Sequence, residues 1–482
     1  MQVDKLHNVN KCKVLIYGDF MVDKYIIGDV NRISPEAPVP ILQVNKKNSK
    51  LGGAGNVVNN ILALGASTRV LGCVGNDADG EWIVTRLNKR NADTRFMKCD
   101  EDVMTIVKTR IVSKKQQYMR LDEEVVKDIP DSYAEFVKEN IESIYEDISV
   151  LIISDYGKGA VTKELAQFLI CYANEKNISI VVDPKGKDYS KYNGATLCTP
   201  NTNELKVVKG LPSDSEEIIT KAGFELREDI NLKYLMLTRS EKGISVFDEK
   251  NKYDYPAVEK EVVDVTGAGD TVVSVVALAL AVGYEIGDCC RLANLAASVV
   301  CSKFGAATLS MNELFECILY SGEFKLVKLD VAEFVAENLR EKGKKIVFTN
   351  GCFDLVHAGH VSSFNQAKEM GDVLIVAINS DKSIKRIKGD KRPIVDENNR
   401  IKMLCALDCI DYVILMEDDN PIDIIKTIKP DITVKGKDWE DKFLPEREIV
   451  ESYGGQVRFI KLEEGLSTTN IINKILEINR NE

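Results

Sequence analysis

Short hydrophobic runs alternate with amphipathic stretches through the first half of the chain. Five runs rich in β-branched residues cover residues 14–19, 68–75, 150–157, 178–186 and 234–240. Amphipathic stretches with helical periodicity lie between several of them, as at residues 132–147 and 162–176. This alternation predicts a mostly parallel sheet with helices on both faces. Ligand sites in such folds lie beyond the carboxyl ends of the strands.

Two segments of the first half have a different pattern. Residues 26–45 and 103–121 alternate between apolar and polar positions without a following helix. We interpret them as a small antiparallel sheet outside the main one, which could act as a lid. The longest apolar run, residues 272–283, is too short to span a membrane and predicts a buried helix.

A second series of strands and helices begins near residue 345. Its strands are predicted in KKIVFTNGCFD, VLIVAINSD, DYVILM, DITVKGKD and VRFIKLEE. The pattern predicts a first domain over residues 1–320, a linker and leading helix over 321–343, and a second domain over 344–482. The sequence thus predicts two domains, each of the α/β class.

The composition of the chain limits the classes of ligand that it could bind. The chain has 482 residues, enough for two large α/β domains, and a net charge of −11. This negative net charge argues against a protein that coats nucleic acid, while a local pocket could still bind small phosphorylated ligands. No signal peptide or membrane span is expected, and the twelve cysteines contain no C-x-x-C pair. Reduced thiols and a cytoplasmic location are therefore predicted.

A glycine-rich turn before an apolar helix is the sharpest feature of the first half. Gly267, Ala268 and Gly269 precede the helix, whose first N–H groups could hold an anion. Asp270 lies at the helix start, where it could take the proton from a hydroxyl during phosphoryl transfer. The alternative is an ordinary capping aspartate after a glycine turn.

Polar residues also follow several predicted strands. Glu204 could bind Mg²⁺, and Lys185 could reach a phosphate. Candidate residues at these strand ends for ATP and its phosphates are Lys185, Asn201, Thr202, Asn203, Glu204, Thr238 and Gly243. Each segment alone could be a simple turn, but their joint position at strand ends favours a site.

The first half also contains a candidate polyol pocket. Asp19 and Asp23 lie in GDFMVD, and Gly52, Gly53 and Asn56 lie in a glycine-rich helix start. Glycines there would let the backbone approach a ligand. Tight packing between a helix and a strand is the alternative reading of these glycines.

These motifs, with DYGKG at 155–159, together resemble the ribokinase (PfkB) sugar kinases over residues 11–315. The resemblance implies a ribokinase-like fold and Asp270 as the catalytic base. It implies an anion hole at 267–269 and ATP–Mg²⁺ binding around 201–204. It also implies sugar binding by Asp19 and Asn56.

The second half contains two of the three histidines of the chain. His357 and His360 are three residues apart, so they share one face of a first helical turn. Their N–H groups could hold phosphate oxygens and stabilise a pyrophosphate leaving group. A metal site is the rival reading, although H-x-x-H lacks a third nearby ligand. Two incidental polar residues are the remaining alternative.

Other segments could complete this second site. Lys388 and Arg392 follow a predicted strand, and Ser467, Thr468 and Thr469 form a predicted helix start that could bind phosphate or simply cap the helix. With TNGCFDLVHAGH, these segments resemble the cytidylyltransferase-like nucleotidyltransferases over residues 344–478. The resemblance implies a Rossmann-like fold, nucleotide contacts near Gly351, Phe353 and Asp354, and in-line attack on an α-phosphate without a covalent intermediate.

The two halves in one chain, with RISPEAPVP at 32–40 and VKGKDW at 434–439, resemble the bifunctional heptose-7-phosphate kinase/heptose-1-phosphate adenylyltransferases. The resemblance implies ATP, Mg²⁺ and sugar-phosphate substrates, a product used in bacterial surface glycan assembly, and a homodimer through the lid strands. Lys437 departs from the expected glycine, which puts acceptor contacts of the second half in question. The alternatives are another phosphosugar or nucleotide, or a binding protein without turnover.

Overall fold

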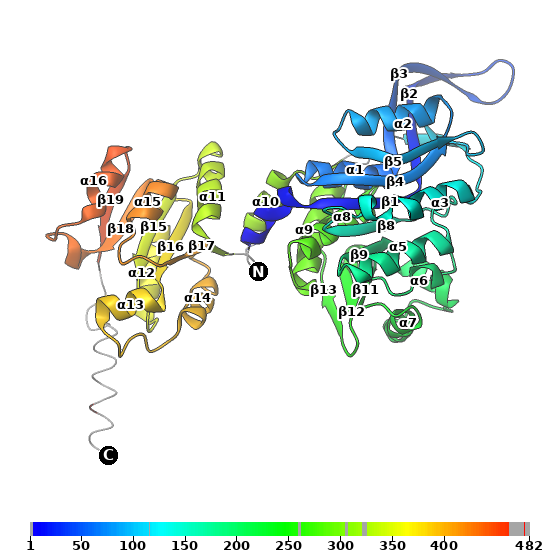
Figure 1. Cartoon of the computed structure of the whole chain (residues 1–482). Coiled ribbons are helices and arrows are strands. Elements are labelled where there is room, and N and C mark those ends of the chain that lie inside the picture. The colour runs from blue at the N-terminus through cyan, green and yellow to red at the C-terminus, as the bar shows by residue number, and fades with distance from the viewer. Residues whose placement is uncertain are drawn as a thin grey trace. The chain divides into compact units, whose positions relative to one another are not determined.

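The computed structural model describes residues 3–114, 116–258, 262–303, 307–320, 325–461 and residue 477 (Figure 1). The chain divides into two compact units. The larger contains residues 8–317, and the smaller contains residues 318–482 together with 1–7. Each unit is described separately.

The larger unit contains a nine-stranded sheet. Its strand order is β13 (Lys252–Tyr255), β12 (Ile244–Phe247), β11 (Tyr234–Thr238), β10 (Leu197–Cys198), β9 (Ser179–Asp183), β8 (Val150–Ser154), β1 (Lys13–Gly18), β4 (Ser67–Gly75) and β5 (Asp93–Asp100). The strands from β11 to β5 are parallel, and β12 and β13 are antiparallel additions. The predicted parallel sheet is therefore confirmed for this unit.

Helices cover both faces of this sheet. On one face, α3 (Asp131–Glu139), α4 (Ile141–Ile144), α5 (Lys163–Glu175), α6 (Thr202–Lys209) and α7 (Glu216–Asp229) contribute to one apolar cluster with the strands. The remaining helices are α1 (Ala54–Ala63), α2 (Ala78–Asn88), α8 (Ala268–Ala281), α9 (Ile286–Cys301) and α10 (Met311–Tyr320). Helix α8 packs on α1, β8 and β9, so the apolar run predicted as a buried helix lies in the core.

The predicted helix over 132–147 is two helices, α3 and α4. The break falls at Asn140, whose side-chain amide donates to the Phe136 carbonyl oxygen at 2.8 Å. Asparagine competes in this way with the regular helical bonds, and α3 ends there.

The second sheet of the larger unit has four strands, in the order β3 (Pro40–Gly53), β2 (Phe20–Ile33), β6 (Ile106–Ser113) and β7 (Gln116–Glu123). We call this sheet the lid. Strands β2 and β3 extend away from the main sheet (Figure 1). The outer pairs of strands are antiparallel as predicted, whereas β2 and β6 are parallel. In the chain β2 follows β1 and β6 follows β5, and β1 and β5 run in the same direction in the main sheet.

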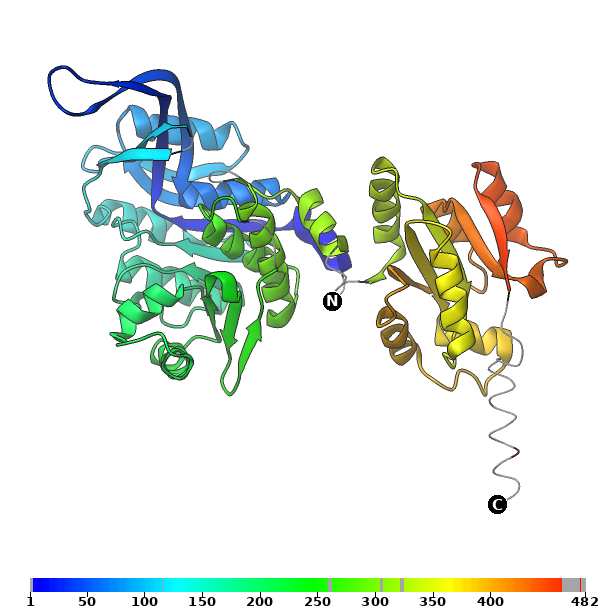
Figure 2. The same ribbon diagram turned by 180° about the vertical axis from the view of Figure 1, so that it is seen from behind.

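The smaller unit contains a six-stranded parallel sheet (Figure 2). Its order is β14 (Leu326–Val327), β17 (Tyr412–Met416), β16 (Val373–Asn379), β15 (Ile346–Gly351), β18 (Ile432–Gly436) and β19 (Gln456–Ile460). The helices are α11 (Leu329–Glu341), α12 (Ala358–Lys368), α13 (Asp381–Lys388), α14 (Glu397–Cys405), α15 (Ile422–Ile428) and α16 (Pro445–Ser452). The strand order reverses at β15, the position where open α/β sheets bind ligands.

Two sequence expectations can be compared with the whole described chain. All twelve cysteines fall in the described ranges and are free thiols. No helix among the described residues is long and apolar enough to cross a membrane.

Candidate active sites

Asp19 follows β1, the strand at which the order of the main sheet reverses. Its side chain is 2% exposed and accepts hydrogen bonds from three backbone N–H groups, those of Tyr156 (2.7 Å), Lys158 (3.2 Å) and Ala160 (2.9 Å). These bonds hold the loop after β8 against the end of β1. Burial raises the pKa of Asp19, and the three N–H donors oppose that rise.

Asp270 lies in the first turn of α8 and is only 7% exposed. The Asn56 amide donates to one carboxylate oxygen at 2.5 Å, and the Tyr156 hydroxyl donates to the other at 2.6 Å. Burial raises the pKa of Asp270, and the two hydrogen bonds limit that rise. Each oxygen keeps a second lone pair, so the carboxylate can still accept a proton from a substrate hydroxyl.

The turn before Asp270 leaves space for a ligand. Gly267 has φ of 81°, the left-handed conformation that favours glycine, and it begins α8. A Cβ on Gly269 would meet no atom within 4 Å. The Ala268 N–H donates to the Val265 carbonyl oxygen at 3.2 Å, whereas the N–H groups of Gly267 and Gly269 lie at the start of this fourteen-residue helix beside open space, which suits an anion.

Lys185 and Glu204 lie together at the ends of neighbouring strands. The Lys185 ammonium donates to Glu204 at 2.7 Å, and Glu204 forms a reciprocal capping box with Asn201 at the start of α6. Thr202 and Asn203 form the first turn of that helix. Burial, Asp270 and Glu204 hold the pKa of Asp183 well above its usual range. Among the residues that the structure describes, no three His, Cys, Asp or Glu side chains lie together so that they could hold a metal ion directly.

The other predicted phosphate turn lies beside this cluster. Asn201 bridges to Thr238, and the Thr238 N–H donates to the Pro200 carbonyl oxygen at 2.9 Å. Gly243 has a packing role, since a Cβ there would lie 2.2 Å from the Tyr255 carbonyl oxygen. The two turns are thus adjacent, as their position at strand ends predicts.

The glycines of the candidate sugar pocket contact the root of the lid. A Cβ on Gly52 would lie 2.4 Å from a carboxylate oxygen of Asp23, and one on Gly53 would lie 2.3 Å from the Asp19 carbonyl oxygen. Asp23 pairs with Arg110 of β6 and acts electrostatically on Asp270. Asp23 is therefore the carboxylate of GDFMVD that faces the catalytic region.

Tyr156 was not among the predicted site residues, although its motif DYGKG was visible. Its hydroxyl reaches Asp270 only because Asp19 fixes the loop after β8, a contact between segments more than one hundred residues apart. A strand-end tyrosine carries no sequence signal for that role.

In the smaller unit, His357 and His360 lie at the start of α12, directly beyond the strand where the sheet order reverses. Their rings stack with centroids 3.9 Å apart, and the backbone N–H of His357 donates to Nδ1 of His360 at 3.4 Å. Burial, His357 and Lys388 lower the pKa of His360 to about 4. Burial also lowers the pKa of His357. A neutral His360 that accepts at Nδ1 carries its proton on Nε2, where it can donate to a phosphate.

Asp354 has a different environment from the histidines. It is 2% exposed, and its oxygens accept from the Arg392 side chain and from the N–H groups of Ile394 (2.7 Å) and Val395 (3.1 Å). Asp354 thus fixes the segment that carries Arg392.

Two further predicted residues line the turn after β15. Gly351 packs under Phe353, whose ring lies edge-on to His360 with centroids 5.3 Å apart. Lys388 ends α13 and acts electrostatically on His360. Ser467, Thr468 and Thr469 lie outside the described residues.

Residues 11–313 match the pfkB family of carbohydrate kinases, and residues 348–474 match the cytidylyltransferase-like family. Phosphofructokinase-2 from Escherichia coli in complex with potassium aligns with a TM-score of 0.55 at 21% identity, over 64% of this chain and 98% of its own. Ribokinase from Arabidopsis thaliana, complexed with ribose and ATP, aligns with a TM-score of 0.51 at 17% identity over 64% and 98%. The fold class is thus confirmed: a ribokinase-like carbohydrate kinase precedes a Rossmann-like nucleotidyltransferase.

Curated relatives extend over both units. The bifunctional protein HldE of Syntrophotalea carbinolica is 41% identical over 476 residues, which cover 98% of this chain and 97% of the relative. HldE of Helicobacter pylori is 43% identical over 468 residues, which cover 96% and 98%. The chain belongs to the bifunctional HldE family. The predicted resemblance is confirmed, and the chain is a sugar kinase and an adenylyltransferase in one polypeptide.

Proposed function

We propose that the first activity uses ATP to phosphorylate O1 of D-glycero-β-D-manno-heptose 7-phosphate. We assign it to residues 1–320, with 321–343 as linker and leading helix. Asp270 takes the proton of the attacking hydroxyl, and the N–H groups of Gly267 and Gly269 stabilise the transferring phosphoryl group. Asn56 and Asp23 hold sugar hydroxyls. The single observation that carries this proposal is the buried Asp270 carboxylate between two donors, at 2.5 and 2.6 Å, beside an open helix start.

ATP binds in this proposal along the strand ends that carry Lys185, Asn201–Glu204 and Thr238. Glu204 with Asp183 would hold Mg²⁺ through water, and the ion would neutralise phosphate charge. Lys185 leaves Glu204 and donates to a phosphate when the nucleotide binds. The roles of Asp19 and Gly243 are structural: they hold the loops that carry these groups.

The second activity, over residues 344–482, transfers AMP from ATP to heptose 1-phosphate and releases pyrophosphate. Neutral His357 and His360 donate N–H groups to phosphate oxygens, and Lys388 and Arg392 supply positive charge. Asp354 holds the segment of Arg392 in place. The 1-phosphate attacks the α-phosphate directly, and no covalent enzyme intermediate forms.

The decisive experiment separates the two reactions. The purified chain is incubated with ATP, Mg²⁺ and either heptose 7-phosphate or heptose 1-phosphate, and products are measured by mass spectrometry. Asp270→Asn abolishes ADP release and keeps pyrophosphate release, whereas His360→Ala does the reverse. If either substitution silences both reactions in a folded chain, the assignment of two independent sites is wrong.

Two further properties belong to this proposal. The lid exposes Val44, Met119 and Leu121, each about half exposed, which supports a homodimer through lid strands. The free thiols and nucleotide substrates support a cytoplasmic location. Size-exclusion chromatography with light scattering tests the dimer, and a monomer at micromolar concentration would refute it.

A further inference from the structure

A buried ion pair lies at the carboxyl ends of β15 and β18 in the smaller unit. The Lys435 ammonium pairs with the Glu446 carboxylate at 2.5 Å and donates to the side-chain oxygen of Asn350 at 2.8 Å. The Glu446 side chain is 4% exposed. The two strands are neighbours whose register pairs Phe348 with Thr433, so Asn350 and Lys435 occupy matching positions two residues further along.

This ion pair borders the crevice at which the strand order of the smaller unit reverses. Strand β15 lies between β16 and β18, and ligands of open α/β sheets bind at such a position. Both strands are buried up to Phe348 and Val434 and are only partly buried beyond them, so their ends open to solvent. The turn after Asn350 carries Phe353, whose ring lies edge-on to His360 with centroids 5.3 Å apart. Lys435 therefore borders the same crevice as the histidine site.

The Lys435 ammonium keeps one donor for a ligand. An ammonium has three N–H groups, and among the residues that the structure describes only Glu446 and Asn350 accept from this one. The Trp439 ring, which is 42% exposed, has its centroid 5.9 Å from the ammonium. Replacing a buried ion pair by apolar residues is often neutral or stabilising, so stability alone does not account for this pair. The pair holds a cation beside an accessible aromatic ring at the crevice.

In-line transfer places the acceptor and the leaving group on opposite sides of the α-phosphate, because the attacking and leaving oxygens lie roughly in line. The cations Lys388 and Arg392 follow β16, on one side of β15, whereas Lys435 follows β18, on the other side. Pyrophosphate held by the histidines and the cations after β16 therefore leaves the β18 side of the crevice for the acceptor.

We propose that Lys435 binds the phosphate of the sugar 1-phosphate acceptor, while Glu446 and Asn350 hold its ammonium in position. This assignment rests on the proposed second activity and adds a binding residue to it. One oxygen of the 1-phosphate forms the new bond to the α-phosphorus as the bond to the pyrophosphate oxygen breaks, and the electron pair of that bond leaves with pyrophosphate. Lys435 donates to an oxygen of the acceptor phosphate that does not react, and the Trp439 ring contacts the sugar.

The test measures pyrophosphate release while heptose 1-phosphate and ATP are varied separately. Lys435→Met alone leaves the Glu446 carboxylate buried without a partner, which destabilises the unit, so the test variant is Lys435→Met combined with Glu446→Gln. Its KM for heptose 1-phosphate rises about tenfold to hundredfold, the effect expected for one hydrogen bond between charged groups. Its KM for ATP stays unchanged. Glu446→Gln alone keeps the ammonium and its bond to Asn350, so its KM for heptose 1-phosphate rises less than that of the double variant.

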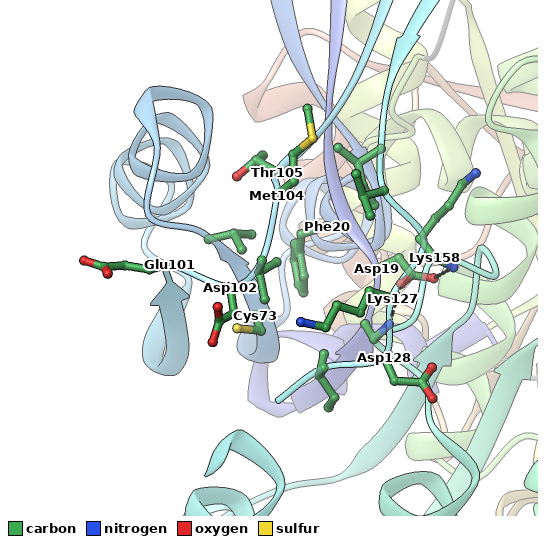
Figure 3. A pocket seen from close by; sticks show the side chains of 16 residues that line it. Asp19, Phe20, Cys73, Glu101, Asp102, Met104, Thr105, Lys127, Asp128 and Lys158 are labelled. Atoms are coloured by element: carbon green, nitrogen blue, oxygen red, sulfur yellow. Dashed lines mark hydrogen bonds between the residues drawn. The ribbon is translucent and has the colours of Figure 1, made fainter. Parts of the chain in front are cut away.

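Two controls each remove a lysine outside the proposed contact. Lys442 is exposed, and its ammonium lies 4.9 Å from the centroid of the Trp439 ring. Lys127 belongs to the larger unit, where it lines a cavity of about 200 Å³ together with Asp19 (Figure 3). Lys442→Met and Lys127→Met leave both KM values of the transferase reaction unchanged.

Each outcome decides the role of Lys435. An unchanged KM for heptose 1-phosphate in the double variant overturns it, and so does an equal rise in the KM for ATP, which indicates a structural role. A KM as high in Glu446→Gln as in the double variant assigns the effect to Glu446 and overturns it as well. If the wild-type chain binds heptose 1-phosphate in calorimetry but releases no pyrophosphate, the proposed second activity fails, and equal affinity in wild type and double variant then overturns the role of Lys435 separately. If the wild-type chain does not bind heptose 1-phosphate, both proposals fail.

Discussion

The hydrogen bond from Tyr156 to Asp270 offers the sharpest test of the kinase site. The 2.6 Å bond joins a buried hydroxyl to a buried carboxylate, and Tyr156→Phe removes only the hydroxyl. The phenyl ring keeps its packing, and the bond from Asn56 remains. The substitution therefore changes the electrostatics of Asp270 and leaves its position unchanged.

The structure sets the direction and size of the effect. The bond stabilises the charged form of Asp270, so its loss raises a pKa that burial has already raised. A raised pKa means that the deprotonated, active form is lost at a higher pH as the solution is acidified. A hydrogen bond to a charged group contributes about 1.5–3 kcal/mol, which corresponds to an acid limb of kcat/KM that lies about one to two pH units higher.

The assay is a pH profile of ADP release from pH 4 to 10. In Tyr156→Phe, the acid limb moves to higher pH and the rate approaches the wild-type value at the alkaline end. Tyr145→Phe is the matched control, because it removes a buried hydroxyl that donates to the Leu169 carbonyl oxygen at 2.8 Å away from the site. A constant loss at every pH would show that Tyr156 contacts substrate and does not tune Asp270, and an unchanged rate would refute the reasoning outright.

Other predictions concern the transferase site and the stability of the larger unit. Because the pKa of His360 is lowered to about 4, pyrophosphate release is flat from pH 6 to 8; a tenfold fall per pH unit above 6.5 would show that imidazolium is required. Arg69→Met lowers the free energy of unfolding by about 3–5 kcal/mol in urea titrations, since the buried guanidinium bonds Asp93 and three carbonyl oxygens. Arg95→Met, at an exposed partner of the same carboxylate, lowers the free energy of unfolding much less than Arg69→Met does. Arg95 and Arg69 hold the pKa of Asp93 below its usual range, so this stability is present at neutral pH and is lost as the solution is acidified below about pH 4; a free energy of unfolding that is constant from pH 7 to pH 3 would contradict it.

The fold was accessible from the sequence because its strong signals are local. Strand-length apolar runs and intervening helical periods predicted both parallel sheets, and the glycine turn before residue 270 predicted a helix start. The break at Asn140 was missed because a side-chain bond ended a helix whose apolar period continued. The parallel pairing of two lid strands was missed because alternation predicts a strand and says nothing about its neighbour's direction.

The candidate sites could be predicted only in part from the sequence. The two histidines lie together because short spacing on one helical turn fixes their position, and Asn56 contacts Asp270 because each lies near the start of a buried helix. Tyr156 acquires its role from a loop that another segment positions, so no local pattern contains that information.

Two buried aspartates show that a motif residue can also hold a loop in place. Asp19 follows β1 and Asp354 follows β15, and their contact with ligand remains a prediction. Each accepts backbone N–H groups of a neighbouring loop, and those bonds offset the cost of burying its charge. Asp19 thereby places Tyr156 beside the catalytic base, and Asp354 places the segment of Arg392 near the histidine site. A motif aspartate can thus be required for activity without touching substrate, because the reacting groups are held by the loops that it fixes.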